Sequence, residues 1–314
     1  MYTAVFPDAD ESLNSVLSDH ARALVPDMVV HYGTPDRDGL IARLQGHAVM
    51  LNNESYVDET VLAACPSLRA IVFLGTGAAS YVDLDACARR DIPVRTISGY
   101  GDRSVAEHAI GLLFAVFRQI AELDRELRGG VWKPRAIAEI GGKTLGVVGL
   151  GPIGAEVARM GSALGMKVLG WNRSPLRQSL PVELVELDEL LARSDAVSLH
   201  IGLNDGTRGM FGPERLRRMK RGAILINTAR AALTDEATLL AMLCDGHLRG
   251  AGLDVFHKEP LPAENPLRAL SNVVLTPHSG WSSPEAAKRQ MDSGYQLMRT
   301  ELDRLRGINS ANAA

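Results

Sequence analysis

Short apolar runs alternate with helix-forming stretches along almost the whole chain, and this alternation restricts the fold more than any other feature. It is typical of α/β proteins, in which helices join parallel strands. In the first hundred residues, helix-forming stretches such as 12–24 and 84–90 separate five predicted strands: Thr3–Phe6, Met28–His31, Ala48–Leu51, Ala70–Phe73 and Val94–Ile97. This part therefore predicts a small flavodoxin-like α/β unit with a parallel sheet.

A second series of the same kind begins at Thr144 and fits a Rossmann-type sheet. Before it, the apolar stretch 104–128 predicts one long helix with Ser104 as its N-cap. After it, the pattern over Pro284–Leu305 predicts a C-terminal helix. The second series contains six predicted strands: Leu145–Val148, Lys167–Leu169, Ala196–Leu199, Ala223–Ile226, Gly250–Val255 and Val273–Leu275. The predicted fold class is thus α/β, with two parallel-sheet domains.

Composition narrows the choice of partners and compartment. The chain has 314 residues, enough for two domains, and its net charge of −3 argues against nucleic acid or an anionic membrane as a partner. No run approaches the ~18 apolar residues of a membrane span, and the first ten residues lack the basic start of a signal peptide. The three cysteines, Cys65, Cys87 and Cys244, have no metal-type spacing and predict small packed residues. We therefore expect a cytoplasmic protein without a metal site.

A glycine-rich phrase, Gly149-Leu-Gly-Pro-Ile-Gly154, follows the first strand of the second series and opens a helix-forming stretch. This strand, turn and helix context is the one that a dinucleotide fingerprint requires. The first glycine permits the tight turn, the second lets the backbone approach a diphosphate, and the third lets helix pack on strand. We therefore expect a cofactor diphosphate at this helix N-terminus, bound by Gly149, Gly151, Pro152, Ile153 and Gly154.

The end of the next strand bears on the choice between NAD and NADP. An NAD site expects a carboxylate about 20 residues after the glycines to bind the ribose hydroxyls, and here that place falls on Asn172. Arg173, Ser174 and Arg177 follow it and could pair with a 2′-phosphate. The alternative is that Asn172 binds the ribose while Arg173 faces solvent. We favour NADP and keep NAD as the second possibility.

Three polar residues follow later predicted strands of the same series: Arg230, Glu259 and His278. Ligands of open α/β sheets bind beyond the carboxyl ends of the strands. An arginine there can hold a substrate carboxylate through two parallel hydrogen bonds. An imidazole can donate a proton to a carbonyl oxygen, and a carboxylate can keep that imidazole protonated and oriented. Together they predict reduction of a 2-keto acid.

These phrases together resemble the D-isomer-specific 2-hydroxyacid dehydrogenase family, from about Ile71 to about Ser283. The family's arginine, glutamate and histidine fall on Arg230, Glu259 and His278 in the expected order. The resemblance implies a discontinuous substrate domain, residues 1–101 plus 284–314, and a dinucleotide-binding domain, residues 102–283. It also implies a cleft between the two domains and a homodimer formed through the cofactor domain.

The resemblance assigns further contacts. Leu74, Gly75 and Thr76 would bind the substrate carboxylate, and Thr76 would also touch the nicotinamide end. The next residues, Ala79-Ser-Tyr-Val-Asp83, depart from the family pattern. The remaining implied cofactor contacts are Thr228, Ala229, Asp254, Ser279 and Gly280, with the carboxylate of Asp254 accepting a bond from the carboxamide.

Glu107 and His108 are adjacent and could form a second acid–base pair, but they resemble a structural element of the family's connecting helix.

The expected activity is NAD(P)H-dependent reduction of a small 2-keto acid, such as glyoxylate or hydroxypyruvate, to the D-2-hydroxy acid. A phosphoglycerate-dehydrogenase-like enzyme is one alternative. A nucleotide-sensing protein similar to the C-terminal-binding corepressors is another, although those carry an acidic residue where this chain has Asn172.

Overall fold

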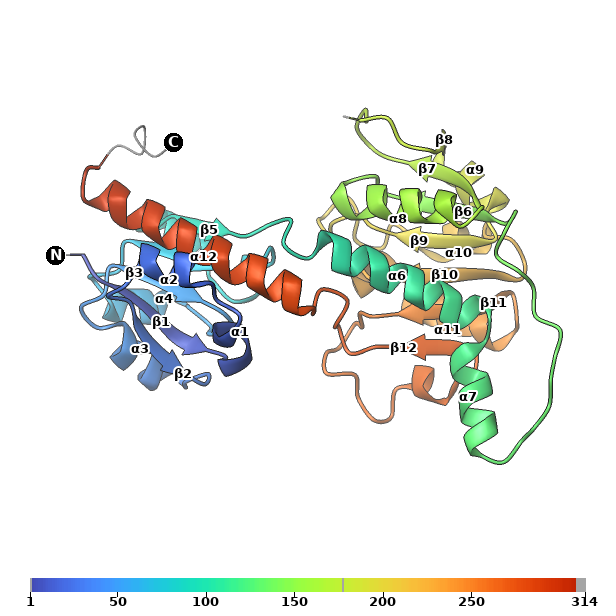
Figure 1. Ribbon diagram of the computed structural model, residues 1–314, viewed down its shortest axis with the longest axis horizontal. Coiled ribbons are helices and arrows are strands. Elements are labelled where there is room, and N and C mark those ends of the chain that lie inside the picture. The colour runs from blue at the N-terminus through green and yellow to red at the C-terminus, as the bar shows by residue number, and fades with distance from the viewer. Residues whose placement is uncertain (1, 177, 309–314) are drawn as a thin grey trace. The chain divides into compact units, whose positions relative to one another are not determined.

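The computed structural model describes residues 2–176 and 178–308. The chain divides into two compact units. The first contains the residues before Asp102 together with those from Ser282 onward, and the second contains Asp102–Trp281. Each unit has a parallel sheet between helices, which confirms the predicted α/β class (Figure 1).

The first unit has a five-stranded sheet in the order β2-β1-β3-β4-β5, the order of flavodoxin-like folds. All neighbouring pairs are parallel. The three central strands are fully buried because helices cover both faces. The strands are β1 (Ala4–Ala9), β2 (Val29–Tyr32), β3 (Val49–Asn52), β4 (Ala70–Phe73) and β5 (Val94–Thr96).

Helices on the two faces of this sheet build two cores. On one face, Phe6, Leu51 and Val72 pack against Met291 and Tyr295 of the C-terminal helix. On the other face, Val5, Met50 and Ile71 join side chains of α3, α4 and α5. The helices of this unit are α1 (Glu11–Ser15), α2 (Asp19–Leu24), α3 (Arg37–Leu44), α4 (Glu59–Ala64), α5 (Leu84–Arg89) and α12 (Pro284–Leu305).

The helix predicted over 12–24 is two helices, because Ser18 interrupts it. The Ser18 hydroxyl accepts a bond from the Ala21 amide and so begins α2, while both its hydroxyl and its backbone N–H donate to Asp292. The departing segment 79–83 forms a single 3₁₀ turn, Ala78–Ser80, before Asp83 caps α5.

The second unit has seven parallel strands in the order β12-β11-β10-β9-β6-β7-β8. The prediction of six strands was wrong by one, because β8 has only two residues and both are exposed, so it carries no apolar run. The strand order reverses between β6 and β9, which is the doubly wound Rossmann arrangement. The strands are β6 (Thr144–Val148), β7 (Lys167–Trp171), β8 (Glu183–Leu184), β9 (Ala196–Leu199), β10 (Ala223–Asn227), β11 (Leu248–Leu253) and β12 (Val273–Leu275).

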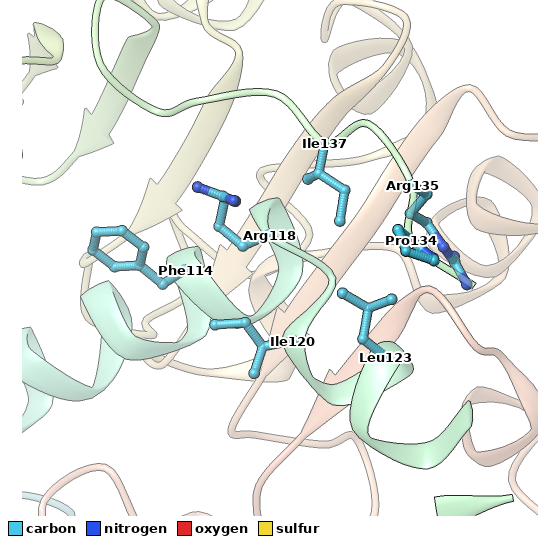
Figure 2. Close-up of a pocket in the computed structure, with 7 residues that line it drawn as sticks. All are labelled: Phe114, Arg118, Ile120, Leu123, Pro134, Arg135 and Ile137. Carbon is cyan, nitrogen blue, oxygen red and sulfur yellow. The ribbon is translucent and has the colours of Figure 1, made fainter. Parts of the chain in front are cut away.

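The predicted helix over 104–128 is also broken. Helix α6 (Asp102–Phe117) begins two residues before Ser104, so the prediction of Ser104 as N-cap was wrong. Gln119 then adopts a left-handed conformation at φ +53°, and α7 (Ile120–Arg128) leaves at 59° to α6. Figure 2 shows the hollow beside this bend, with a volume of about 650 Å³, lined by Phe114, Arg118, Ile120, Leu123, Pro134, Arg135 and Ile137.

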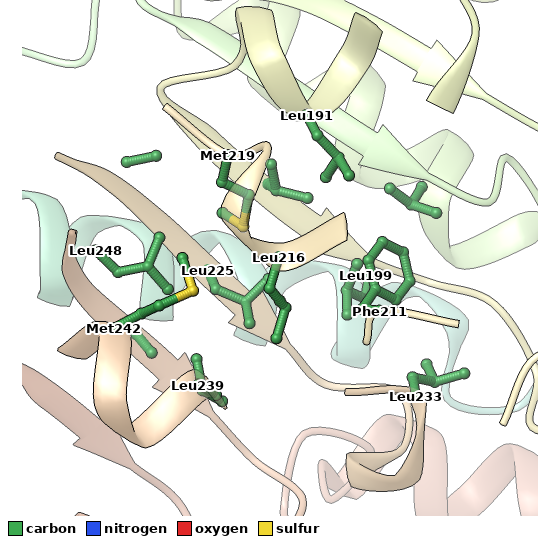
Figure 3. Close-up of a cluster of buried hydrophobic side chains, with 14 of the residues drawn as sticks. Leu191, Leu199, Phe211, Leu216, Met219, Leu225, Leu233, Leu239, Met242 and Leu248 are labelled. Atoms are coloured by element: carbon green, nitrogen blue, oxygen red, sulfur yellow. The ribbon is translucent and has the colours of Figure 1, made fainter. Parts of the chain in front are cut away.

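Two cores flank the seven-stranded sheet. On one face, α6 and α8 (Pro152–Ala163) pack on Val147 and Ile224. On the other face, α9 (Leu187–Arg193), α10 (Pro213–Arg217) and α11 (Glu236–Cys244) bury Leu191, Leu216 and Leu239 against Leu199 and Leu225 (Figure 3). Leu225 and its neighbour Ile224 thus face opposite cores, as successive residues of a strand must.

Two of the three cysteines match their prediction. Cys65 and Cys87 are buried, and burial raises the pKa of the Cys87 thiol to about 11. Cys244 is exposed at the end of α11, so its prediction as a packed residue was wrong. Within the described residues, no single helix has both the length and the apolar composition of a membrane span, although the bent pair α6 and α7 reaches them jointly.

Candidate active site

The glycine phrase forms a tight turn between β6 and α8. Gly149 has φ +90°, and a Cβ there would lie 2.6 Å from the carbonyl oxygen of His200. At Gly154 a Cβ would lie 1.8 Å from the carbonyl oxygen of Gly149. Both positions therefore require glycine for the fold itself. Gly151 differs, because a Cβ there would have no neighbour within 4 Å and its φ of −67° suits any residue. Space is thus left beside Gly151, as the close approach of a diphosphate requires.

The turn lies at the switch point of the sheet, where β6 and β9 are neighbours. His200 follows β9 and its amide donates to the carbonyl of Val148 at 2.8 Å. Its imidazole Nε2 lies 2.7 Å from the hydroxyl of Ser198. Burial lowers the pKa of His200 to about 4, so this imidazole is neutral at physiological pH.

Asn172 joins the end of β7 to the glycine turn. Its Oδ1 accepts a bond from the backbone N–H of Leu150 at 3.0 Å, and its Nδ2 donates to the carbonyl of Ser174 at 2.7 Å. Arg173 and Ser174 are exposed, and the guanidinium of Arg173 has no partner among the described residues. Arg177 lies outside the described residues.

His278 and Glu259 come together although 19 residues separate them in the sequence. The imidazole Nδ1 lies 2.8 Å from Oε2 of Glu259, and the other carboxylate oxygen accepts the backbone N–H of Phe256 at 2.9 Å. Glu259 is thereby held at two points. No described residue makes a hydrogen bond to Nε2 of His278, and 41% of this side chain is exposed. The imidazole is therefore oriented at one nitrogen and open at the other.

Arg230 lies just after β10, the strand next to β11, which Glu259 follows. Its guanidinium is exposed, and its one bond within the described part of the chain runs from Nη1 to the carbonyl of Ala229. Asn227 fixes the backbone of this turn by accepting from the Ala229 amide and donating to the Arg230 carbonyl. Thr228 is 8% exposed, and its buried hydroxyl has no hydrogen-bond partner in the part of the chain that the structure describes. This edge of the sheet thus offers a cation and an unsatisfied hydroxyl.

Asp254 is buried, and its carboxylate already accepts several hydrogen bonds from the folded chain. It is 2% exposed and accepts the Thr276 hydroxyl at 2.6 Å and the amides of Ser279 and Gly280 at 2.9 Å each. Burial alone would raise the pKa of Asp254, but hydrogen bonds from His108, Thr276 and the two amides outweigh it and lower the pKa. The carboxylate expected to contact a carboxamide therefore already holds the turn around His278.

Glu107 and His108 do not form a pair. Glu107 is exposed and accepts from Arg103, whereas Nε2 of His108 lies 2.9 Å from the hydroxyl of Thr276. His108 is a residue whose link to the site sequence reasoning missed. The sequence gives one signal for this link. His108 lies four residues before the buried Leu112, and residues at this spacing share one face of a helix.

The predicted substrate loop belongs to the first unit, after β4. The amides of Leu74 and Gly75 already donate to the carbonyls of Asn52 and Phe73, so neither is free for a carboxylate in this conformation. The amides of Thr76 and Gly77 have no acceptor within the described residues. Gly77, which the prediction omitted, thus offers a donor that Leu74 does not.

The hollow of Figure 2 contains none of the predicted catalytic or cofactor residues. No group of three or more His, Cys, Asp or Glu residues with metal-binding geometry occurs in residues 2–176 and 178–308.

Known proteins share this architecture. The family model for the NAD binding domain of D-isomer specific 2-hydroxyacid dehydrogenases matches residues 110–280. A D-3-phosphoglycerate dehydrogenase of Mycobacterium tuberculosis is 42% identical over 261 residues, 81% of this chain and 49% of the relative. A glyoxylate reductase of Korarchaeum cryptofilum is 40% identical over 245 residues, 75% of this chain and 74% of the relative.

Among solved structures, an acyclic imino acid reductase in complex with NADPH and D-Arg is 31% identical, with a TM-score of 0.83 over 98% of each chain. The chain spans about half the length of the phosphoglycerate dehydrogenases that it matches. The matched family domain covers more than half of the chain and includes the glycine turn, Arg230, Glu259 and His278. The chain belongs to the D-isomer specific 2-hydroxyacid dehydrogenase family.

Proposed function

We propose that the protein reduces a small 2-keto acid to the D-2-hydroxy acid and that His278 donates the proton. The observation that carries this proposal is the arrangement of His278 and Glu259. Glu259 holds Nδ1 at 2.8 Å and leaves Nε2 open. A protonated imidazole so oriented can donate from Nε2 to a carbonyl oxygen, and the carboxylate stabilises its charge.

Arg230 would bind the substrate carboxylate. Its guanidinium is exposed and makes a single bond to its own turn, which leaves donors for a bidentate contact. The chemistry that a reduced nicotinamide supplies when bound is hydride for the carbonyl carbon.

The residues of the second unit fit a nicotinamide dinucleotide. The space beside Gly151 and the N-terminus of α8 suit a diphosphate. The unsatisfied hydroxyl of Thr228 suits a polar group at the carboxyl edge. We propose NADPH as the preferred form, since the exposed guanidinium of Arg173 has no partner within residues 2–176 and 178–308 and no carboxylate stands at position 172.

The substrate class rests on the relatives. A glyoxylate reductase and phosphoglycerate dehydrogenases are both similar to this chain, so we propose a glyoxylate- or hydroxypyruvate-like acid. Oxidation of 3-phosphoglycerate is the competing activity.

Initial rates of NADPH and NADH oxidation with glyoxylate, hydroxypyruvate and pyruvate test this proposal, with 3-phosphoglycerate oxidation as a separate arm. We expect turnover of a 2-keto acid with NADPH preferred. His278→Ala should lower kcat by roughly 10²- to 10⁴-fold. The exposed-surface variant Glu107→Gln should keep the full rate. An unchanged rate in His278→Ala contradicts the assignment of the acid.

We also propose that a second copy of the chain docks on the second unit. Helix α7 buries none of its side chains, and exposed apolar residues gather on it and on the segment after it. They are Ile120, Leu127, Val131 and Trp132, the last 83% exposed. Exposed apolar side chains that lie together on a surface mark a protein–protein interaction site. Sedimentation should show a dimer, and Leu127→Glu should dissociate it; a monomeric wild-type protein contradicts the proposal.

A further inference from the structure

The turn that carries His278 is held in an uncommon backbone conformation. His278 has φ +50°, a left-handed value that residues other than glycine rarely adopt. Its amide donates to the carbonyl of Thr276 at 3.0 Å, which closes the turn. Such a conformation persists only where the surroundings hold it.

Asp254 holds this turn on both sides of His278. Before the histidine, the Thr276 hydroxyl donates to Oδ1 at 2.6 Å. After it, the amides of Ser279 and Gly280 donate to Oδ1 and Oδ2 at 2.9 Å each. Because the carboxylate is 2% exposed, water cannot replace these bonds without opening the turn.

His108 supports the same carboxylate from α6. The single hydroxyl proton of Thr276 goes to Asp254, so its oxygen must accept from His108, whose Nε2 lies 2.9 Å away. Nε2 also lies 3.4 Å from Oδ1 of Asp254. The His108 tautomer is therefore fixed, with the proton on Nε2.

The His108 ring also forms a wall of the turn. A Cβ at Gly280 would lie 3.3 Å from Cδ2 of His108 and 3.0 Å from Oδ2 of Asp254. The turn thus rests on the ring as well as on the carboxylate.

We propose that His108 is a positioning residue that acts through Thr276 and Asp254 to hold His278 in its donating position. This inference rests on the proposed reductase function. In this role His108, on α6, affects catalysis indirectly, through Thr276 and Asp254, and does not touch the reacting atoms. Displacement of a catalytic group by about 1 Å can cost roughly a hundredfold in rate.

Kinetics of paired variants test the proposal. His108→Phe keeps a ring but removes the donor, and Thr276→Val removes the bridging hydroxyl. Each should lower kcat by about tenfold to a hundredfold, while the Kd for NADPH changes by less than about threefold. His108→Gln retains an N–H near the position of Nε2, and Thr276→Ser retains the hydroxyl. Both should restore most of kcat. Glu107→Gln lies on the same helix, where Glu107 pairs with Arg103, and should match the wild type.

The double variant His108→Phe/Thr276→Val separates positioning from general destabilisation. If both residues act along one path, its kcat should fall no further than that of the worse single variant. Multiplied losses, or an unchanged kcat in both single variants, overturn the proposal.

Hydrogen exchange gives a readout that does not depend on turnover. The amides of Ser279 and Gly280 should exchange faster in His108→Phe than in the wild type or in Glu107→Gln, because their acceptor is less firmly held. Equal exchange in all three proteins overturns the positioning role. If the wild type reduces no 2-keto acid, the proposed function fails, and the exchange comparison still decides whether His108 holds the turn.

Discussion

Oδ1 of Asn172 accepts a hydrogen bond from the backbone N–H of Leu150 at 3.0 Å, so one side chain at the end of β7 fixes the middle of the glycine turn. Its Nδ2 donates to the carbonyl of Ser174 and thereby shapes the loop that presents Arg173. The same residue thus holds both segments that would bind a dinucleotide. The side-chain amide of Asn172 is neutral, whereas an NAD site usually carries a negatively charged carboxylate at this position.

Asn172→Asp should reverse the cofactor preference. An aspartate can accept the same bond from Leu150, and its carboxylate can accept bonds from ribose hydroxyls. It cannot donate to the Ser174 carbonyl, and its charge repels a 2′-phosphate. We expect kcat/KM for NADPH to fall by about tenfold to a hundredfold, with NADH unchanged or improved. Asn204→Asp adds the same charge in an exposed turn and should leave the ratio as it is. An unaltered NADPH-to-NADH ratio in Asn172→Asp argues against the 2′-phosphate assignment.

Replacement of two glycines of the turn by alanine should affect different properties: the stability at Gly154 and the affinity for NADPH at Gly151. In Gly154→Ala the new methyl group meets the Gly149 carbonyl at 1.8 Å, a backbone contact that cannot relax. We expect destabilisation of the second unit by about 3 kcal/mol or more. In Gly151→Ala the methyl group has no neighbour within 4 Å, so stability should hold while NADPH binds at least about tenfold more weakly.

Tryptophan fluorescence can follow this comparison, because Trp132, Trp171 and Trp281 all belong to the second unit. Thermal or urea unfolding gives the stability, and a titration with NADPH gives the affinity. Wild-type NADPH affinity in Gly151→Ala would show that the space beside this glycine does not receive the cofactor.

The strands and their polar ends could be predicted because burial on both faces of a parallel sheet leaves apolar runs in the sequence. The predicted ends of β10, β11 and β12 therefore directed attention to the polar residues that follow them: Arg230, Glu259 and His278. The two-residue strand β8 and the break of the long helix at Gln119 leave no such trace. The first is a short exposed pair of residues, and the second depends on the backbone conformation of a single residue and on tertiary packing.

The contact between His108 and Thr276 could not be predicted for a different reason. These residues are 168 positions apart, and no local pattern pairs a helix with a particular strand end. Similarly, the sequence predicts the amide of Gly75 as a donor for a substrate, whereas in the structure this amide donates to the carbonyl of Phe73. Residue types could thus be assigned from the phrases, whereas the hydrogen bonds already made depend on the folded chain.

Glu259→Gln should lower turnover without unfolding the protein. A glutamine side chain can still accept the Phe256 amide, but it carries no charge to stabilise a protonated His278. We expect kcat to fall by about a hundredfold or more, with little change in melting temperature since Glu259 is partly exposed. Glu264→Gln alters an exposed glutamate five residues away and should behave as the wild type. Equal rates for the two variants would remove Glu259 from the mechanism.

The neutral imidazole of His200 should make the stability of the second unit depend on pH. Burial lowers its folded-state pKa to about 4, below the unfolded value of 6.5. The unfolded chain therefore binds the proton first as the pH falls, so this contribution is present above about pH 6.5 and is lost toward pH 4. Between pH 7 and pH 5 the loss should be about 2 kcal/mol at most.

Urea unfolding followed by tryptophan fluorescence at pH 7, 6 and 5 measures this slope in the second unit. His47, whose pKa is also lowered by burial, lies in the first unit and contributes little to that signal. His200→Asn removes the titrating group beside Ser198 and should flatten the dependence over this range. A slope that persists in His200→Asn would mean that another group of the second unit takes up the proton, and that the switch point tolerates a charged imidazole.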